Sequence, residues 1–145
     1  MILYLDTSAL LKKYFKEVGS TEVISRWKEA AGIVTSSVAY AEIMASIYRK
    51  KRELSINDNI FRRVISSFQG DWNSFICVGV TDELNEMIDK ILATHPLRGF
   101  DAIHLASALT VRERIPEDFL FACFDRRLVK VAQMESLNTL PAKIE

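Results

Sequence analysis

Two aspartates stand just after short apolar runs of this sequence, where parallel strands commonly present functional side chains. Asp6 follows the run 1–5, and Asp125 follows the run 119–124. If both runs are strands of one parallel sheet, their carboxyl ends lie at the same edge and both carboxylates emerge there. The sequence therefore predicts a pair of carboxylates at one edge of a sheet.

Two further acids are candidates to join that pair. Asp101 opens a helical segment, and Gly99 just before it lets the chain turn tightly. Glu42 lies within a helical segment, among small and apolar neighbours. It stands beside the stripe that we expect to face inward, which comprises Val38, Ala41, Ala45 and Tyr48. A carboxylate beside such a stripe is poorly placed as a purely solvated charge.

Four carboxylates at one place would indicate metal-dependent hydrolysis. Two carboxylates ~4 Å apart repel by about 4 kcal/mol at an effective dielectric constant of 20, so a cluster persists only with protons or cations. Oxygen ligands suit hard cations, of which Mg²⁺ or Mn²⁺ fits best. Such an ion polarises a phosphodiester, lowers the pKa of an attacking water and stabilises the leaving oxygen. Convergence of the acids is what the fold has to supply.

Each acid also has a purely structural interpretation. The three aspartates could be helix N-caps, whose side chains accept hydrogen bonds from unpaired backbone N–H groups. Glu42 could be a boundary charge paired with Arg49 or Lys50 on the same helix. These interpretations stay open at the level of sequence.

Strands and helices are expected to alternate along the chain. Strands are predicted at 1–5, 32–35, 75–80 and 119–124, and helices at 8–15, 20–31, 38–52, 55–68, from 81, at 101–112 and from 125. Ser20 is a candidate cap, and Ser55 with Asp58 resembles a capping box with Asp in place of Glu. Short, apolar strands that alternate with helices indicate a parallel sheet covered on both faces, an α/β sandwich.

The composition is that of one ordinary globular domain, and it argues against several classes of protein. The chain has 145 residues, 49% of them hydrophobic, and nineteen basic residues balance nineteen acidic ones. The balance argues mildly against a dedicated nucleic-acid binder, although basic residues cluster at 49–52, 62–63 and 126–130. No apolar run approaches the ~20 residues of a membrane span. Cys77 and Cys123 have neither metal spacing nor a disulfide pattern, so a cytoplasmic protein with no membrane contact is expected.

Four motifs, in order along the chain, resemble those of the PIN domain. They are LDTSAL at 5–10, AE at 41–42, FDAIHLASA at 100–108 and FDRRL at 124–128. Within that family they look most like the VapC toxins of prokaryotic toxin–antitoxin pairs. The resemblance implies a single PIN domain over residues 1–145, with a three-layer α/β/α sandwich around a short, mostly parallel sheet.

The resemblance also implies an activity, that of a Mg²⁺- or Mn²⁺-dependent endoribonuclease. Its products would be a 5′-phosphate and a 3′-hydroxyl, because water attacks and no residue forms a covalent intermediate. Asp6, Glu42, Asp101 and Asp125 match the family's catalytic acidic quartet. The principal metal ligands would be Asp6 and Asp101, with Asp125 as a further ligand and Glu42 acting directly or through water. Ser8 matches the hydroxyl that supports the first aspartate.

Three residues near the motifs have further predicted consequences. Relatives often place Thr or Ser where this chain has Cys123, and a thiol is a weaker donor, so Asp125 is expected to be held less firmly. His104, one helical turn after the third acid, and Arg126 are candidates to bind substrate phosphate. The alternative for His104 is a helix histidine satisfied by the protein's own hydrogen bonds.

Partners follow from the same resemblance. The expected substrate is RNA, with transfer RNA first and ribosomal RNA next. A VapB-like antitoxin would lay a helix along segment 38–68 and send a basic residue into the acidic pocket, and the toxin would form a homodimer. Residues 49–52 are predicted to lie near the tip between the two helices of that segment. The alternative is a PIN-like module that binds RNA or protein without cleaving.

Overall fold

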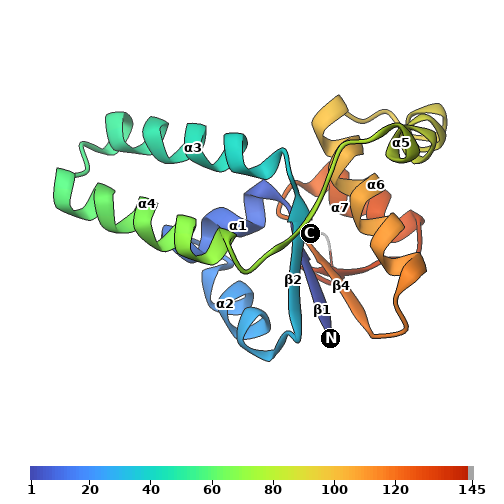
Figure 1. The fold of residues 1–145 in the computed structure, drawn as a ribbon, viewed down its shortest axis with the longest axis horizontal. Coiled ribbons are helices and arrows are strands. Elements are labelled where there is room, and N and C mark those ends of the chain that lie inside the picture. The colour runs from blue at the N-terminus through green and yellow to red at the C-terminus, as the bar shows by residue number, and fades with distance from the viewer. Residues whose placement is uncertain (144–145) are drawn as a thin grey trace.

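Five parallel strands form one sheet at the centre of the computed structural model, which describes residues 1–143 (Figure 1). They are β1 (Ile2–Leu5), β2 (Gly32–Ser36), β3 (Ile76–Val78), β4 (Phe119–Ala122) and β5 (Asn138–Leu140). The order across the sheet is β3-β2-β1-β4-β5, and every neighbouring pair is parallel. The chain goes from β1 to β2 on one side, whereas β4 lies on the other. The topological switch point therefore falls between β1 and β4.

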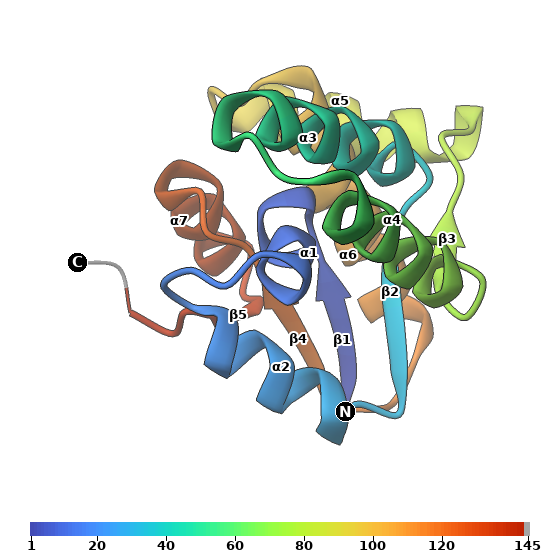
Figure 2. The same cartoon turned by 90° about the vertical axis from the view of Figure 1, so that its left-hand side faces the viewer.

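Helices cover both faces of the sheet, which gives three layers (Figures 1 and 2). One layer contains α1 (Thr7–Tyr14), α2 (Ser20–Glu29), α3 (Ala39–Leu54) and α4 (Asp58–Trp72). The other contains α5 (Asp82–Thr94), α6 (Gly99–Arg114) and α7 (Arg126–Met134). The predicted α/β/α sandwich is confirmed. None of the helices in the described part of the chain has the length and apolar content that crossing a bilayer requires.

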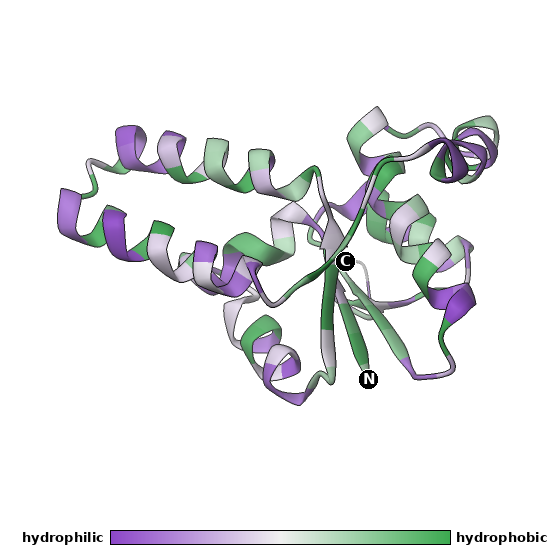
Figure 3. Ribbon diagram, viewed as in Figure 1, coloured by the Kyte–Doolittle hydropathy of each residue, from purple (hydrophilic) through white to green (hydrophobic). Residues whose placement is uncertain are grey.

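The central strand divides its side chains between two hydrophobic clusters. Leu3 and Leu5 pack with α1 to α4, whereas Tyr4 packs with α5 to α7, because successive residues of a strand face opposite sides. All three side chains are fully buried, and Figure 3 shows the central strands as mainly hydrophobic ribbons. Burying one such side chain stabilises the fold by about 1.5–3 kcal/mol. The sheet is thereby a firm base for groups at its edge.

The antiparallel pair of α3 and α4 extends away from the sheet, and its far end is hydrophilic in Figure 3. Residues 49–52 lie in the last turns of α3, next to the tip at 55–57 that joins the two helices. The predicted position of this basic run is confirmed.

Two predicted caps are placed differently in the structure. Gly19, not Ser20, precedes the first turn of α2. Ser55 ends α3 at a positive φ of 51°, and Asn57 caps α4 by accepting a hydrogen bond from the Ile60 N–H at 2.9 Å. The capping-box prediction was wrong because asparagine caps as well as serine does and stands directly before the helix.

The inward face of α3 differs from the expected stripe. Ala41, Ala45 and Tyr48 are exposed. The buried residues of the helix are Ala39, Ile43, Ser46 and Ile47. Two bulky isoleucines have more apolar surface to bury than alanines do, and they set the rotation of the helix. Glu42 still lies at the edge of the buried face, because it precedes Ile43.

The sheet contains one strand more than predicted, and one predicted strand lies at its edge. β5 is short and partly polar, and it forms by pairing with β4, where Thr139 lies opposite Phe121. Its sequence carries no strong strand pattern, so only the neighbouring strand reveals it. β3 is the other edge strand, and Ile76 and Cys77 are exposed although its apolar run predicted a covered strand.

Candidate active site

Asp6 is fixed at the end of β1 by the helix that follows it. Its Oδ1 accepts hydrogen bonds from the Ala9 N–H at 2.9 Å and from the Ser8 hydroxyl at 2.6 Å, so Asp6 is the N-cap of α1. The side chain is 5% exposed. Within residues 1–143, the protein makes no hydrogen bond to Oδ2. Both hydrogen bonds fall on one oxygen, so capping does not occupy the other.

Ser8 ties the ends of β1 and β4 together. Its Oγ donates to Asp6 Oδ1 and accepts a hydrogen bond from the backbone N–H of Phe124 at 2.9 Å. Phe124 directly precedes Asp125, so one hydroxyl orients the first acid and holds the segment that carries the fourth.

Asp125 caps α7 in the way that Asp6 caps α1. Its Oδ1 accepts a hydrogen bond from the Leu128 N–H at 3.0 Å, and the residue is exposed. The thiol of Cys123 contacts the backbone of Asp125, with 3.4 Å between Sγ and the Asp125 nitrogen. Burial, and then the nearby Asp6 carboxylate, raise the pKa of the Cys123 thiol well above its usual range, so it stays neutral. The carboxylate of Asp125 is thus oriented by the Leu128 N–H, whereas the thiol contacts the backbone of Asp125.

Asp101 lies in the first turn of α6 and is half-buried. It is not the cap, because Arg98 occupies that position. Burial raises its pKa above the usual value, and the negative charges of Asp125 and Asp6 raise it further, while His104 and Arg98 oppose the shift. The charges of Asp125 and Asp6 thus reach Asp101, and Asp101 and Asp125 line the same surface depression.

Glu42 is held by side chains from two other helices. Its Oε1 accepts a hydrogen bond from the Thr7 hydroxyl at 2.7 Å and lies 2.8 Å from His104 Nε2. Burial alone would raise the pKa of Glu42, but the hydrogen bonds from His104 and Thr7 outweigh it, and the pKa lies below the usual value. The pairing with Arg49 or Lys50 is not found, because Arg49 bonds Ser46 and the Lys50 ammonium faces Glu17.

His104 is buried and bonded at both ring nitrogens. It is 2% exposed, and its Nδ1 lies 2.8 Å from the Tyr4 hydroxyl while Nε2 faces Glu42. No nitrogen is left to bind a phosphate in this conformation. The structure thus places His104 as the satisfied helix histidine of the alternative interpretation and not as the expected phosphate-binding group.

Arginines line a surface depression beside the acids. Arg98, from the start of α6, and Arg126 and Arg127, from the start of α7, share this depression with Asp101, Phe124 and Asp125. Guanidinium groups form strong, charge-assisted hydrogen bonds with phosphate oxygens. The local charge therefore differs from the neutral sum of the chain, and anionic ligands are favoured at the rim of an acidic centre.

The carboxylates of the site suit a hard divalent cation by their chemistry, but they are spread more widely than the ligands of a bound ion. Aspartate oxygens are the ligands that Mg²⁺ and Mn²⁺ prefer, and the raised pKa of Asp101 records the charge that a cation would neutralise. In this conformation, however, no three His, Cys, Asp or Glu side chains of the described residues gather closely enough to hold a metal ion. Each carboxylate is oriented by its own partners, so the predicted convergence is looser than a closed set of ligands.

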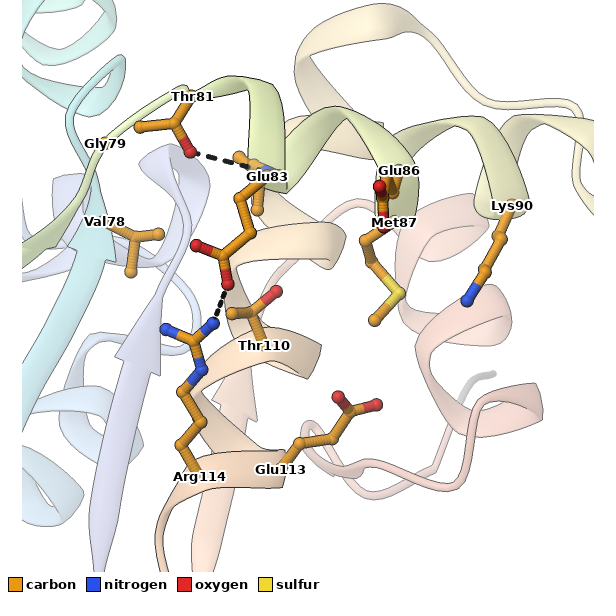
Figure 4. A pocket seen from close by; sticks show the side chains of 11 residues that line it. Val78, Gly79, Thr81, Glu83, Glu86, Met87, Lys90, Thr110, Glu113 and Arg114 are labelled. Carbon is orange, nitrogen blue, oxygen red and sulfur yellow. Dashed lines mark hydrogen bonds and ion pairs between the residues drawn. The ribbon is translucent and has the colours of Figure 1, made fainter.

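Another pocket lies between β3, α5 and α6 and contains none of the four acids (Figure 4). Thr81 caps α5 there, and Glu83 pairs with Arg114 across its mouth. The remaining charges on its walls are Glu86, Lys90 and Glu113. The mixed charges already include an ion pair, and no nucleophile or cluster of acids converges on the pocket, so the strand-end site is the candidate for chemistry.

Two residues that position Glu42 are not predicted from the sequence. Thr7 bonds Glu42 directly, and Tyr4 contacts His104, which in turn contacts Glu42. Thr7 lies within the first motif and carries no prediction of its own, although a hydroxyl directly after a strand-end acid is a recognisable signal. Tyr4 is part of the apolar run 1–5, and nothing in the sequence distinguishes it from a packing residue. Arg98, just before a predicted helix, could have been identified from its place beside the third acid.

Known proteins resemble this chain over nearly its whole length. The sequence profile of the PIN domain family matches residues 3–134. Ribonuclease VapC45 of Mycobacterium tuberculosis (strain CDC 1551 / Oshkosh) and Ribonuclease VapC49 of M. tuberculosis (strain ATCC 25618 / H37Rv) are each 28% identical to it over 148 residues, covering 99% of this chain and 98% of each relative. A solved structure, VapBC2 from Rickettsia felis bound to a DNA fragment from their promoter, has a similar fold. Its TM-score is 0.63 at 11% identity, over 90% of this chain and 92% of that one.

Proposed function

The chain belongs to the PIN domain family, and from this premise we propose that it is a metal-dependent endoribonuclease, the toxin of a VapBC-type toxin–antitoxin pair. The observation that carries the proposal is that Asp101 and Asp125 line one surface depression, beside the strand β1 that Asp6 directly follows. The arginine-lined depression beside them supports a phosphate-bearing substrate. The names of the mycobacterial relatives, both ribonucleases, support RNA as that substrate.

Asp6, Asp101 and Asp125 are the residues that would hold Mg²⁺ or Mn²⁺. When bound, such an ion polarises the phosphodiester and lowers the pKa of an attacking water. Ser8 and the Ala9 N–H fix one oxygen of Asp6 and leave the other for the ion. Glu42, kept ionised by its two hydrogen bonds, orients the water as an acceptor.

Hydrolysis in this site needs no covalent intermediate. The water oxygen bonds to phosphorus and gives up a proton to the solvent, the bond from phosphorus to the 3′ oxygen breaks, and that oxygen takes up a proton from the solvent. The products are a 5′-phosphate and a 3′-hydroxyl. Arg98, Arg126 and Arg127 bind phosphates on either side of the cut, which compensates for the neutral net charge of the chain.

Transfer RNA is the proposed substrate, with ribosomal RNA next. The proposed regulator is a VapB-like antitoxin whose helix packs against the extended pair of α3 and α4 and places a basic residue among the acids. A homodimer would join two arginine rims into one longer channel. Both cysteines of the described chain are free thiols, which is compatible with the cytoplasm, the compartment proposed here.

The test is cleavage of a structured RNA pool by the purified protein with Mg²⁺ or Mn²⁺, beside reactions with EDTA and with Asp101→Asn. Cleavage that disappears in both controls, with 5′-phosphate ends on the products, supports the proposal. No cleavage by the intact protein, despite metal binding in calorimetry and no co-purified antitoxin, would overturn it in favour of a PIN module that only binds.

A further inference from the structure

A chain of hydrogen bonds links Glu42 to the elements that carry two of the other acids. Thr7 directly follows Asp6, at the start of α1, and its hydroxyl donates to Glu42 Oε1 at 2.7 Å. His104 lies one helical turn after Asp101, in α6, and its Nε2 is 2.8 Å from the same oxygen. Glu42, on α3, is therefore connected to both elements by single hydrogen bonds.

Tyr4 stands at the end of this series of hydrogen bonds and fixes the imidazole of His104. Tyr4 in β1 is fully buried, and its hydroxyl lies 2.8 Å from His104 Nδ1. A carboxylate only accepts, so Nε2 carries the proton that faces Glu42. The position of that proton follows from the network of partners, in which the Tyr4 hydroxyl meets Nδ1. The ring packs edge-on against Tyr4, with 5.9 Å between the ring centroids.

Both donors converge on one oxygen of Glu42 and leave the other available. Within residues 1–143, the protein makes no hydrogen bond to Oε2, and the side chain is 29% exposed. A glutamate has three side-chain torsions, and fixing them costs conformational entropy that two hydrogen bonds from packed elements offset.

We infer that Thr7 and His104, with Tyr4 behind His104, are positioning residues that hold the Glu42 carboxylate in register with Asp6 and Asp101. The inference rests on the proposed function, since register between the acids matters only for a reaction that uses them together. None of the three side chains needs to touch RNA. They act by setting where Oε2 stands when the substrate arrives.

Paired substitutions separate positioning from folding. Thr7→Val keeps the shape of the side chain and removes the donor, whereas Thr7→Ser restores a hydroxyl. His104→Asn can still reach toward Tyr4, whereas His104→Gln places its amide where Nε2 donates to Glu42. Thr21→Val makes the same change as Thr7→Val at an exposed site on α2. For each variant we would measure kcat and KM on the cleaved RNA, and the melting temperature.

We expect Thr7→Val and His104→Asn to lower kcat by about 10- to 100-fold, as a displaced catalytic group does, with KM within about threefold of the parent value. Thr7→Ser and His104→Gln should recover most of that loss, and Thr21→Val should match the parent protein.

Two results would overturn the inference while the proposed function stands. One is a parent-like kcat in a folded Thr7→Val protein, and the other is a kcat that follows melting temperature across the variants and not the presence of a donor. If the parent protein cleaves no RNA with either metal ion, the proposed function fails and the inference fails with it.

Discussion

The acids of the site divide into two pairs that are held in different ways. Asp6 and Asp125 stand at the ends of β1 and β4, and each is fixed by a backbone N–H of the helix that follows. Glu42 and Asp101 stand within helices on opposite faces of the sheet, and neither is the N-cap of its helix, since Val38 and Arg98 hold those positions. Glu42 depends on side chains of other elements, and Asp101 faces the repulsion of two neighbours.

This difference separates local from distant causes of active-site geometry. A capped aspartate receives its orientation from residues two to three positions along the chain, so its geometry forms with the helix itself. A helix-borne acid is oriented only after the layers have packed against the sheet. Disturbance of the packing should therefore affect the second pair before the first.

The largest effect is expected for Asp101→Asn. Removing this charge should lower RNA cleavage by about 10³-fold or more, because charge stabilisation by a bound metal ion contributes several kcal/mol. The melting temperature of the metal-free protein should stay the same or rise, because the substitution relieves repulsion from Asp125 and Asp6. Cleavage assays and thermal unfolding check both parts, with exposed Asp89→Asn on α5 as the control. A markedly less stable Asp101→Asn protein would contradict this account of the second pair.

The second largest effect is expected for the arginines of the depression, which one acid of each pair, Asp125 and Asp101, also lines. Arg126→Ala and Arg98→Ala should each raise KM by about three- to tenfold with little change in kcat, and the double variant should show a weaker salt dependence of RNA binding. Arg26→Ala, on α2 in an exposed pair with Glu29, is the matched control. Binding that depends equally on salt in the parent and the double variant would show that the depression holds no phosphate.

The capping role of the first pair predicts a separation of stability from activity. Asp6→Ala should lower the free energy of unfolding by about 1–2 kcal/mol, because the N-cap of α1 is lost. Asp6→Asn keeps an acceptor for the Ala9 N–H and should stay closer to the parent protein. Both substitutions should abolish cleavage. Urea unfolding measures the difference, and equal destabilisation by the two variants would argue against a capping role.

The smallest effect concerns the free energy of unfolding of the metal-free protein. The contributions of Asp101 and Glu42 to it are expected to change with pH in opposite directions. Asp101 has a raised pKa, so its contribution is fully present below about pH 3.9, the usual Asp value, and is lost as the pH rises through its folded pKa. Glu42 has a lowered pKa, so its contribution is present above about pH 4.3 and is lost as the pH falls through its folded pKa.

Unfolding measured from pH 3 to 7 in EDTA distinguishes the two. Relative to the parent, Asp101→Asn should gain stability with rising pH, and Glu42→Gln should lose it. Parallel curves for the two variants would show that the two acids do not differ in the way the structure indicates.

Much of the candidate site could be predicted along the chain. Asp6 and Asp125 were identified because apolar runs precede them, and parallel strands bring such positions to one edge. The position of the basic run 49–52 followed from helix lengths alone. The predicted inward face of α3 was wrong. Alanines at helical spacing resemble a buried stripe, but the larger isoleucines of the helix are the residues that face inward. β5 was missed because its pairing with β4, and not its own sequence, makes it a strand.

What the sequence determined by itself is the set of groups and their local anchors. It specifies that Asp6 and Asp125 follow strands and can cap the helices after them, and that Ser8 stands two residues after Asp6. Capping and strand formation depend on neighbours within a few residues, so these features can be read from the chain. Tertiary structure alone decided that Thr7 and His104 meet on one oxygen of Glu42 and that Tyr4 supports the imidazole. Those contacts join residues 35 to 100 positions apart, and only the packing of helices against the sheet brings them together.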